Sequence, residues 1–200
     1  MTGESADPLG RRSVQPGGRD PAPGDLFLVQ AFINTHYDLE VEHGAELLAT
    51  PADAHRWLYV HNLLGRPGRV DRQGLLRLLT VREALRELGG GNSGGHAAAE
   101  RLNHAARGAG VELRFGAHSP YFVASAPGEV GGAIGLLLAI TVRSMLDGTW
   151  SRLKVCPGDD CGWAFYDHSR NQTGRWCSMA VCGGRAKARA HYRRTRGETG

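Results

Sequence analysis

The apolar positions of this chain recur mainly every three to four residues, the spacing that gathers side chains on one face of an α-helix. The first such segment, Leu26–Ile33, is apolar on both faces, so periodicity alone fits a buried strand as well as a buried helix. The polar residues that follow it carry no turn signal, which favours the helix. Thr50 and Pro51 then supply a helix cap and a first-turn proline, and they predict a second helix that ends near Leu64.

Three more helices are predicted in the middle of the chain, and they are expected over residues 71–89, 96–107 and 130–148. The last of them is the most apolar and is expected at the centre of the core. Between the second and the third, Val111–Phe115 alternates apolar and polar residues, and with residues 121–123 it predicts a small antiparallel hairpin.

These elements divide the chain into three parts. Residues 1–24, rich in Gly, Pro and charge, cannot bury enough apolar surface to fold and are expected to be a disordered leader. Residues 25–150 are expected to form a mainly α domain with a small β hairpin, an α+β arrangement, and residues 151–196 a small treble-clef-like zinc finger. The hydrophobic content of 41% suffices for a core, whereas the longest apolar stretch, residues 130–142, is too short for a bilayer, so no membrane partner is expected.

The chain contains four cysteines, and all of them lie in its C-terminal part with the spacing C-x4-C-x15-C-x4-C. Two pairs of thiolates at this spacing can surround one Zn²⁺ tetrahedrally, which predicts one structural zinc ion bound by Cys156, Cys161, Cys177 and Cys182. Two disulfides, or a redox-responsive thiol cluster, would use the same residues. The first 24 residues lack the apolar segment of a secretory signal, so we expect a cytoplasmic protein, and a reducing compartment favours zinc.

The residues between the cysteines indicate how such a site is built. Pro157–Asp160 is a run of turn formers that can fold the first cysteine pair around one ion. Gly162–Tyr166 has the composition of a strand and Arg170–Gly174 that of a polar turn, so a two-stranded hairpin is expected within the 15-residue gap. A hairpin of this size is marginal alone in water, and zinc is expected to supply much of its folding free energy.

Positive charge is concentrated in the same part of the chain. Residues 151–200 contain ten Lys and Arg but four Asp and Glu, a net charge of +6, whereas the remaining residues carry −2. Beyond the last cysteine the composition is helical, and one stripe of this helix is expected to hold Arg185, Arg189, Arg193 and Arg196, flanked by Lys187 and Arg194. Such asymmetry suggests a nucleic-acid partner. The residues expected to contact its phosphates are Arg170, Arg175, Arg185, Lys187, Arg189, Arg193 and Arg194.

Three other groups of residues admit a functional interpretation. Asp167 and His168 could form a catalytic pair, but four thiolates leave zinc no open position, so Asp167 is expected to brace the hairpin and no enzymatic activity is expected. Trp163 and Trp176 could stack on bases, although the core of a small finger is the favoured role. Asn34 and the two residues after it could border a ligand pocket, although a structural turn or cap is favoured.

The finger sequence resembles a known bacterial family. The positions that carry the resemblance are Cys156, Cys161, Phe165, Asp167, Ser169, Arg170, Trp176, Cys177, Ser178, Met179, Cys182, Gly183, Arg185 and Lys187. They resemble the C-terminal zinc finger of the CGNR family, whose members usually carry an N-terminal ABATE domain, described as a stress-induced transcription regulator. Residues 32–35, 47–51 and 57–58 resemble the opening of that domain. The asparagine that names the family is Gly184 here, so a helix cap or base contact made by that asparagine is in doubt.

The resemblance, with the charge, implies a zinc-dependent DNA-binding transcriptional regulator in the bacterial cytoplasm, associated with the nucleoid. Two alternatives stay open from the residues alone. The basic helix could contact RNA or the ribosome, which competition between duplex DNA and structured RNA would distinguish. The module could also be a redox-responsive protein-interaction site, which needs accessible thiolates of low pKa.

Overall fold

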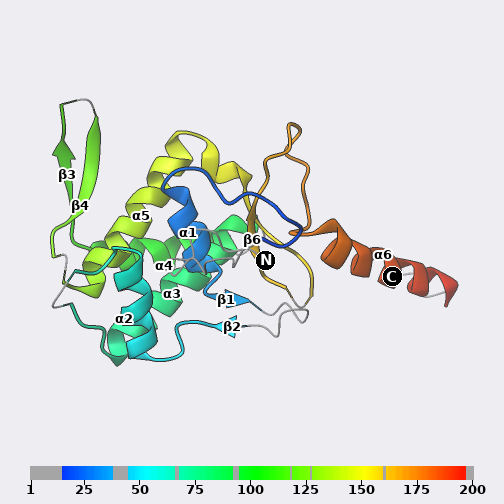
Figure 1. Ribbon diagram of the computed structural model, residues 1–200, viewed down its shortest axis with the longest axis horizontal. Helices are drawn as coiled ribbons and strands as arrows, with labels where there is room; N and C mark the ends of the chain where they lie inside the picture. Colours follow the sequence, from blue (N-terminus) through cyan, green and yellow to red (C-terminus); the bar gives the residue numbers. More distant parts are fainter. Residues whose placement is uncertain are drawn as a thin grey trace, which may run out of the picture.

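The computed structural model describes residues 15–37, 45–65, 68–91, 95–117, 119–126, 128–159 and 161–196 (Figure 1). Its α-helices are α1 (Leu26–Ile33), α2 (Pro51–Val60), α3 (Arg72–Gly89), α4 (Gly95–Arg107), α5 (Val130–Leu146) and α6 (Gly184–Thr195). Its strands pair antiparallel in twos, as β1 (His36–Tyr37) with β2 (Ala45–Glu46), β3 (Val111–Phe115) with β4 (Pro120–Ala124), and β5 (Leu153–Val155) with β6 (Ala164–Tyr166). Two short helical turns are η2 (Thr149–Arg152) and η3 (Met179–Gly183).

Helix α5 lies at the centre of the N-terminal core, as its apolar sequence predicts. It packs against α1, α3 and α4, and α3 packs against α4. Ile134 and Leu137 of α5 are fully buried, in one hydrophobic cluster with Phe32 and Leu85. Within the described ranges, no helix combines the length and the apolar character needed to cross a membrane. The predicted arrangement of a mostly helical domain with small hairpins is therefore confirmed.

The helices begin where the sequence places their caps. Thr50 caps α2, because its Oγ1 accepts a hydrogen bond of 3.2 Å from the backbone N–H of Asp53, and Asp71 caps α3 through a bond of 2.7 Å from the N–H of Gly74. Helix α2 ends at Val60 and not near Leu64 as predicted. The chain leaves the helix at Asn62, whose φ of 57° is left-handed and incompatible with another helical turn.

The hairpin of β3 and β4 packs with its base against the first half of α5, where the sequence has three glycines. A Cβ at Gly132 would lie 2.6 Å from the carbonyl oxygen of Ala126, and a Cβ at Gly135 would collide with Val111. Any larger residue at these two positions would push the hairpin off the helix. The glycines of α5 thus set the position from which the rest of the hairpin projects (Figure 1).

An arginine occupies a core-facing position of α3. Arg82 is 4% exposed, and its guanidinium donates two hydrogen bonds to the carboxylate of Glu46, at 2.7 and 2.8 Å, and one to Thr35 Oγ1 at 3.2 Å. Burial of the Glu46 carboxylate opposes its ionisation, but these hydrogen bonds outweigh burial and hold the pKa of Glu46 below its usual value. Arg82 therefore ties strand β2 to the helical core.

The segment before α1 differs from the sequence-based expectation. Residues 1–14 lie outside the described residues, but residues 15–24, which we expected in a disordered leader, pack against α1 and the C-terminal finger. Gln15 is buried, and its Oε1 accepts hydrogen bonds from Trp163 Nε1 at 2.9 Å and Gln30 Nε2 at 3.0 Å. A high content of polar residues predicts disorder, but here polar side chains hold residues 15–24 in place by hydrogen bonding.

Candidate metal centre and basic helix

The first cysteine pair lies on the loop that joins β5 to β6. These strands pair Leu153 with Tyr166 and Val155 with Ala164, and the ladder continues through a bond of 2.8 Å from Cys156 N–H to the Trp163 carbonyl. The hairpin predicted within the gap between the cysteine pairs is therefore wrong in its pairing: β6 pairs with residues that precede Cys156. Because β5 is only three residues long, its sequence carried no usable strand signal.

The second cysteine pair lies at the turn η3 that leads into α6. Ser178 caps this turn, since its Oγ accepts a hydrogen bond of 3.3 Å from the backbone N–H of Val181. Cys177 precedes the cap and Cys182 falls within the turn, two residues before α6 begins at Gly184. The predicted position of Cys182 near the start of the basic helix is thus confirmed.

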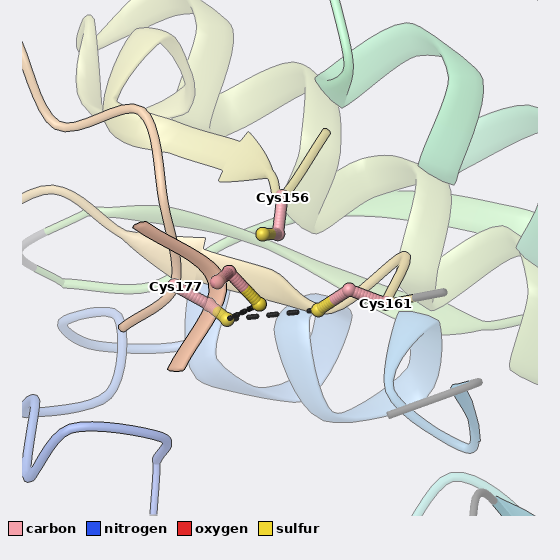
Figure 2. Close-up of side chains that lie close together, drawn as sticks. Cys156, Cys161 and Cys177 are labelled. Carbon is pink, nitrogen blue, oxygen red and sulfur yellow. Dashed lines mark hydrogen bonds between the residues drawn. The ribbon is translucent and has the colours of Figure 1, made fainter. Parts of the chain in front are cut away.

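The four sulfurs converge on one point. Cys156, Cys161, Cys177 and Cys182 are all buried, and their Sγ atoms lie within 4.8 Å of one another. Cys177 Sγ is 3.6 Å from Sγ of both Cys161 and Cys182, and Figure 2 shows the three labelled side chains turned toward one another. A zinc ion with four sulfurs at 2.3 Å requires sulfur–sulfur distances of about 3.8 Å. The donor set, its burial and its dimensions therefore fit a single structural Zn²⁺.

The ionisation of the thiols also calls for a cation. A hydrogen bond joins the side chains of Cys156 and Cys161. It lowers the pKa of Cys156, the acceptor, to about 2 and raises the pKa of Cys161, the donor, to about 12. Burial raises the pKa of Cys182, and the thiolate of Cys156 adds to this effect. Four thiolates this close repel one another, so without metal the cluster retains protons. A bound Zn²⁺ replaces those protons and allows all four sulfurs to be ionised.

A small apolar cluster surrounds the metal centre. Phe165 is fully buried and Trp163 is 5% exposed, and both pack with the cysteines, while Trp176 and Val181 cover the cluster from outside. The favoured role of the two tryptophans as core residues is confirmed. The cluster excludes water from the sulfurs, which strengthens metal binding.

Asp167 holds the loop between β6 and Cys177. Its side chain is fully buried and accepts hydrogen bonds from Lys154 Nζ at 2.8 Å, Ser169 Oγ at 2.6 Å and the backbone N–H of Gly174 at 2.7 Å. Burial opposes ionisation of this carboxylate, but the hydrogen bonds outweigh burial and hold the pKa of Asp167 well below its usual range. His168 is exposed, and its Nε2 atom lies 3.1 Å from the carbonyl oxygen of Pro21. Asp167 is thus the expected structural brace.

Helix α1 binds the finger through the backbone of Ala164. Asn34 donates to the Ala164 carbonyl and accepts from the Ala164 N–H, both at 2.8 Å, and Gln30 Nε2 donates to the same carbonyl at 3.1 Å. The structural role that we favoured for Asn34 is therefore confirmed. Arg86 of α3 adds a bond to the Gly162 carbonyl, while its Nη2 donates to the carbonyls of Ile33 and His36. No sequence pattern predicts this role for Arg86, because helical periodicity places it among ordinary polar positions.

Arg19 fastens the N-terminal segment to the metal centre. Its Nε donates to the Cys177 carbonyl at 2.8 Å and its Nη2 to the Trp176 carbonyl at 3.1 Å, and its guanidinium carbon lies 5.0 Å from the centre of the Phe165 ring. The charge-assisted hydrogen bonds and the cation–π contact of Arg19 both stabilise the packing of the N-terminal segment against the finger.

We expect Arg19→Ala to lower the free energy of unfolding by about 2 kcal/mol, because two buried carbonyls lose their donor. Thermal unfolding of the zinc-loaded protein, with the rate of zinc transfer to a chelator, measures the effect. Asp20→Ala is the matched control, since among the described residues Asp20 forms its hydrogen bond through its backbone carbonyl, which alanine retains. Equal zinc transfer rates in both variants would contradict a role of Arg19 at the metal centre.

Helix α6 carries most of the predicted phosphate contacts and projects from the finger, away from the rest of the molecule (Figure 1). None of its residues is buried and none is acidic. Arg189 of this helix forms an ion pair with Asp159, which lies between the first two cysteines and whose Oδ2 is 3.4 Å from Arg189 Nη2. Arg170 and Arg175 are exposed on the loop before Cys177, and the Arg175 guanidinium lies over the Trp176 ring.

The basic residues of α6 are on two sides of the helix. At about 100° per residue, Arg185, Arg189 and Arg193 share one side. Lys187 and Arg194 fall on the opposite side, so the expectation that they flank the arginine stripe is wrong. The structure therefore places positive charge around the helix and not along a single stripe.

Gly184 begins α6 in an ordinary helical conformation, with φ −63° and ψ −48°. A Cβ at this position would meet only the Met179 carbonyl oxygen, at 3.7 Å, which is a normal contact. The backbone therefore does not require glycine, and there is room at this position for the Cβ of another residue. The difference at Gly184 leaves the metal centre intact.

Known families match both parts of the chain. Residues 27–150 match ABATE, described as a putative stress-induced transcription regulator, and residues 152–195 match the CGNR zinc finger. No curated protein matches the chain. The first match spans more than half of the sequence, and the second ends within α6 and includes all four metal ligands. The chain therefore belongs to the ABATE family of transcription regulators and carries a CGNR zinc finger at its C-terminal end.

Proposed function

We propose that this protein regulates transcription by binding duplex DNA with α6, which the zinc centre orients. The observation that carries this proposal is a helix with basic residues on opposite sides, no acidic residue and no buried side chain. Such a helix gains nothing from the protein core, and its like charges repel one another in the free protein. A phosphate backbone removes that repulsion.

The dimensions of α6 suit the major groove. Twelve residues span about 18 Å, and the groove, about 12 Å wide, admits one α-helix. In that position Arg185, Arg189 and Arg193 face one phosphate backbone while Lys187 and Arg194 face the other. Arg170 and Arg175, on the adjoining loop, are placed to add contacts beyond the groove. A regulator acting in this way works at the nucleoid, in the cytoplasm of the cell.

RNA fits this geometry less well. The major groove of an RNA helix is deep and narrow, so side chains of an inserted helix cannot enter it. A redox sensor is also less well supported, because sensor cysteines are accessible and the four sulfurs here are buried.

The experiment is a salt titration of duplex binding. Lys187→Gln combined with Arg194→Gln should reduce the slope of log affinity against log salt by about 2, since each phosphate contact contributes about 0.9. The matched control is Arg56→Gln combined with Arg72→Gln, which removes two exposed charges from α2 and α3. Equal slopes in the two double variants would contradict insertion of α6.

A variant with the opposite effect sharpens this test. Asp159→Asn removes the carboxylate that competes with phosphate for Arg189 and should raise DNA affinity about twofold, the size of a surface ion pair. Structured RNA is the competitor throughout. Preferential displacement of the protein from DNA by RNA would favour an RNA-binding function.

A further inference from the structure

The hairpin of β3 and β4 projects from the end of the molecule opposite α6 (Figure 1). Its register pairs Val111 with Ala124, Leu113 with Phe122 and Phe115 with Pro120, so these six residues share one apolar face. Phe115 is 82% exposed and Leu113 is 53% exposed. A two-stranded hairpin with a solvent-exposed apolar face is only marginally stable by itself, and it gains stability when further strands pair with it.

Strand β3 has a free edge. Among the described residues β3 pairs only with β4, which lies on the side of α5. Gly110 accepts a bond from the N–H of Ser125, and Gly116 donates to the carbonyl of Ser119. Because bonded positions alternate along an antiparallel ladder, residues 112 and 114 bond to β4, whereas the N–H and C=O groups of Val111, Leu113 and Phe115 point outward.

The order of charges along β3 is complementary to itself. Glu112 and Arg114 flank Leu113 and lie on the polar face of the hairpin. In an antiparallel pair of two β3 strands centred on Leu113, Glu112 of each chain stands opposite Arg114 of the other. The same register places Val111 opposite Phe115, and it pairs the outward backbone groups of residues 111, 113 and 115.

We propose that two copies of this chain associate through β3, forming a four-stranded antiparallel sheet around a two-fold axis at Leu113. The apolar faces of the two hairpins then form one continuous face. The edges of the two β3 strands are paired with each other and are no longer available to other strands. Arg114 Nη2 lies 2.6 Å from Glu112 Oε2 of its own chain. In the dimer Arg114 gains a second carboxylate partner, Glu112 of the other copy. Because the hairpins and α6 are at opposite ends of the molecule, both fingers remain outside the dimer contact. This association does not depend on what α6 binds.

Sedimentation equilibrium of the full, zinc-loaded chain tests the dimer through a charge exchange. Glu112→Arg and Arg114→Glu each set like charges opposite one another at two places in the dimer, and each should weaken association about tenfold. The double variant with both changes restores opposite charges and should recover the wild-type dissociation constant. Glu100→Arg, the same charge change at an exposed position of α4, should leave association unchanged.

A covalent probe tests the position of the axis. Two Cα atoms in a hydrogen-bonded antiparallel pair lie about 5.5 Å apart, within reach of a disulfide. Leu113→Cys should therefore give a cross-linked dimer on mild oxidation, whereas Tyr121→Cys on β4, of similar exposure, should not. A wild-type chain that stays monomeric across the micromolar range would overturn the proposal. A dimer insensitive to both charge reversals would overturn it equally, and would assign the hairpin face to a different protein.

Discussion

Replacing Cys182 by serine should abolish stoichiometric zinc binding and unfold the finger while the helical domain stays folded. The sulfur lies 3.6 Å from that of Cys177, in a cluster where every donor is buried. Zinc contributes on the order of 10 kcal/mol to the folding of isolated fingers, far more than β5 and β6, of three residues each, can supply. The core around α5 does not contain the cysteines, and the finger strands contribute only Leu153, Ala164 and Tyr166 to its buried cluster.

Metal analysis together with hydrogen exchange measures this result. Wild-type protein should contain one zinc per chain, and the variant close to none. Amides of residues 153–183 should lose protection in the variant, whereas those of α3 and α5 should keep it. Ala180→Ser is the matched control, because it introduces serine at an exposed position of the same turn. Full protection of the finger after complete removal of zinc would refute a structural role for the metal.

Replacing Asp167 by asparagine should destabilise the finger by about 3 kcal/mol, the cost of breaking a buried ion pair. Asparagine has the same shape, and its carbonyl can still accept from Ser169. Its amide group cannot accept from the Gly174 N–H or from Lys154, whose ammonium lies 2.8 Å from the native carboxylate. The loop before Cys177 would then lose its brace, and zinc should dissociate faster.

The pH dependence of this loss follows from the lowered pKa of Asp167. A carboxyl group whose pKa is lower in the folded than in the unfolded protein stabilises fully above the unfolded value, about 3.9, and loses that contribution as pH falls through the folded value. The stability difference between wild type and Asp167→Asn should therefore stay constant from neutral pH to about pH 5 and shrink only below about pH 4.

Chemical denaturation at several pH values, read from the tryptophans of the finger, supplies the measurement. Asp159→Asn is the control, since this exposed aspartate forms only a surface ion pair, worth less than about 1 kcal/mol. A stability difference for Asp167→Asn that did not shrink below about pH 4 would show that the pKa of this carboxyl is the same in the folded and the unfolded protein, and so that Asp167 does not form the brace.

The sequence was most informative where local chemistry decides the structure. Thr50 and Asp71 mark the starts of α2 and α3 because a side-chain cap requires only three residues of chain, all visible in the sequence. The same holds for the metal centre, whose four ligands are the only cysteines available. The spacing also placed Cys182 beside the basic helix, since turn formers and helix formers follow one another there.

Long-range pairing was not accessible in the same way. Strand β5 is three residues long, and its partner lies beyond the whole first cysteine loop, so no local pattern revealed the pairing. The contacts of Gln15 and Arg19 join positions about 150 residues apart, so no local pattern predicts them. Judged by composition alone, these polar residues indicate disorder. The position of Lys187 and Arg194 opposite the arginine stripe, by contrast, follows from helix geometry alone.

The backbone of Ala164 is part of the zinc-bearing hairpin of β5 and β6. The same backbone is hydrogen-bonded to Gln30 of α1 and to Asn34, which follows α1. Metal affinity and the conformation of the helical domain are therefore linked quantities, and the linkage is reciprocal. Zinc binding should add to the stability of the helical domain, and folding of that domain should strengthen zinc binding by the same free energy. A change that loosens α1 should therefore be detectable at the metal centre as weaker zinc binding.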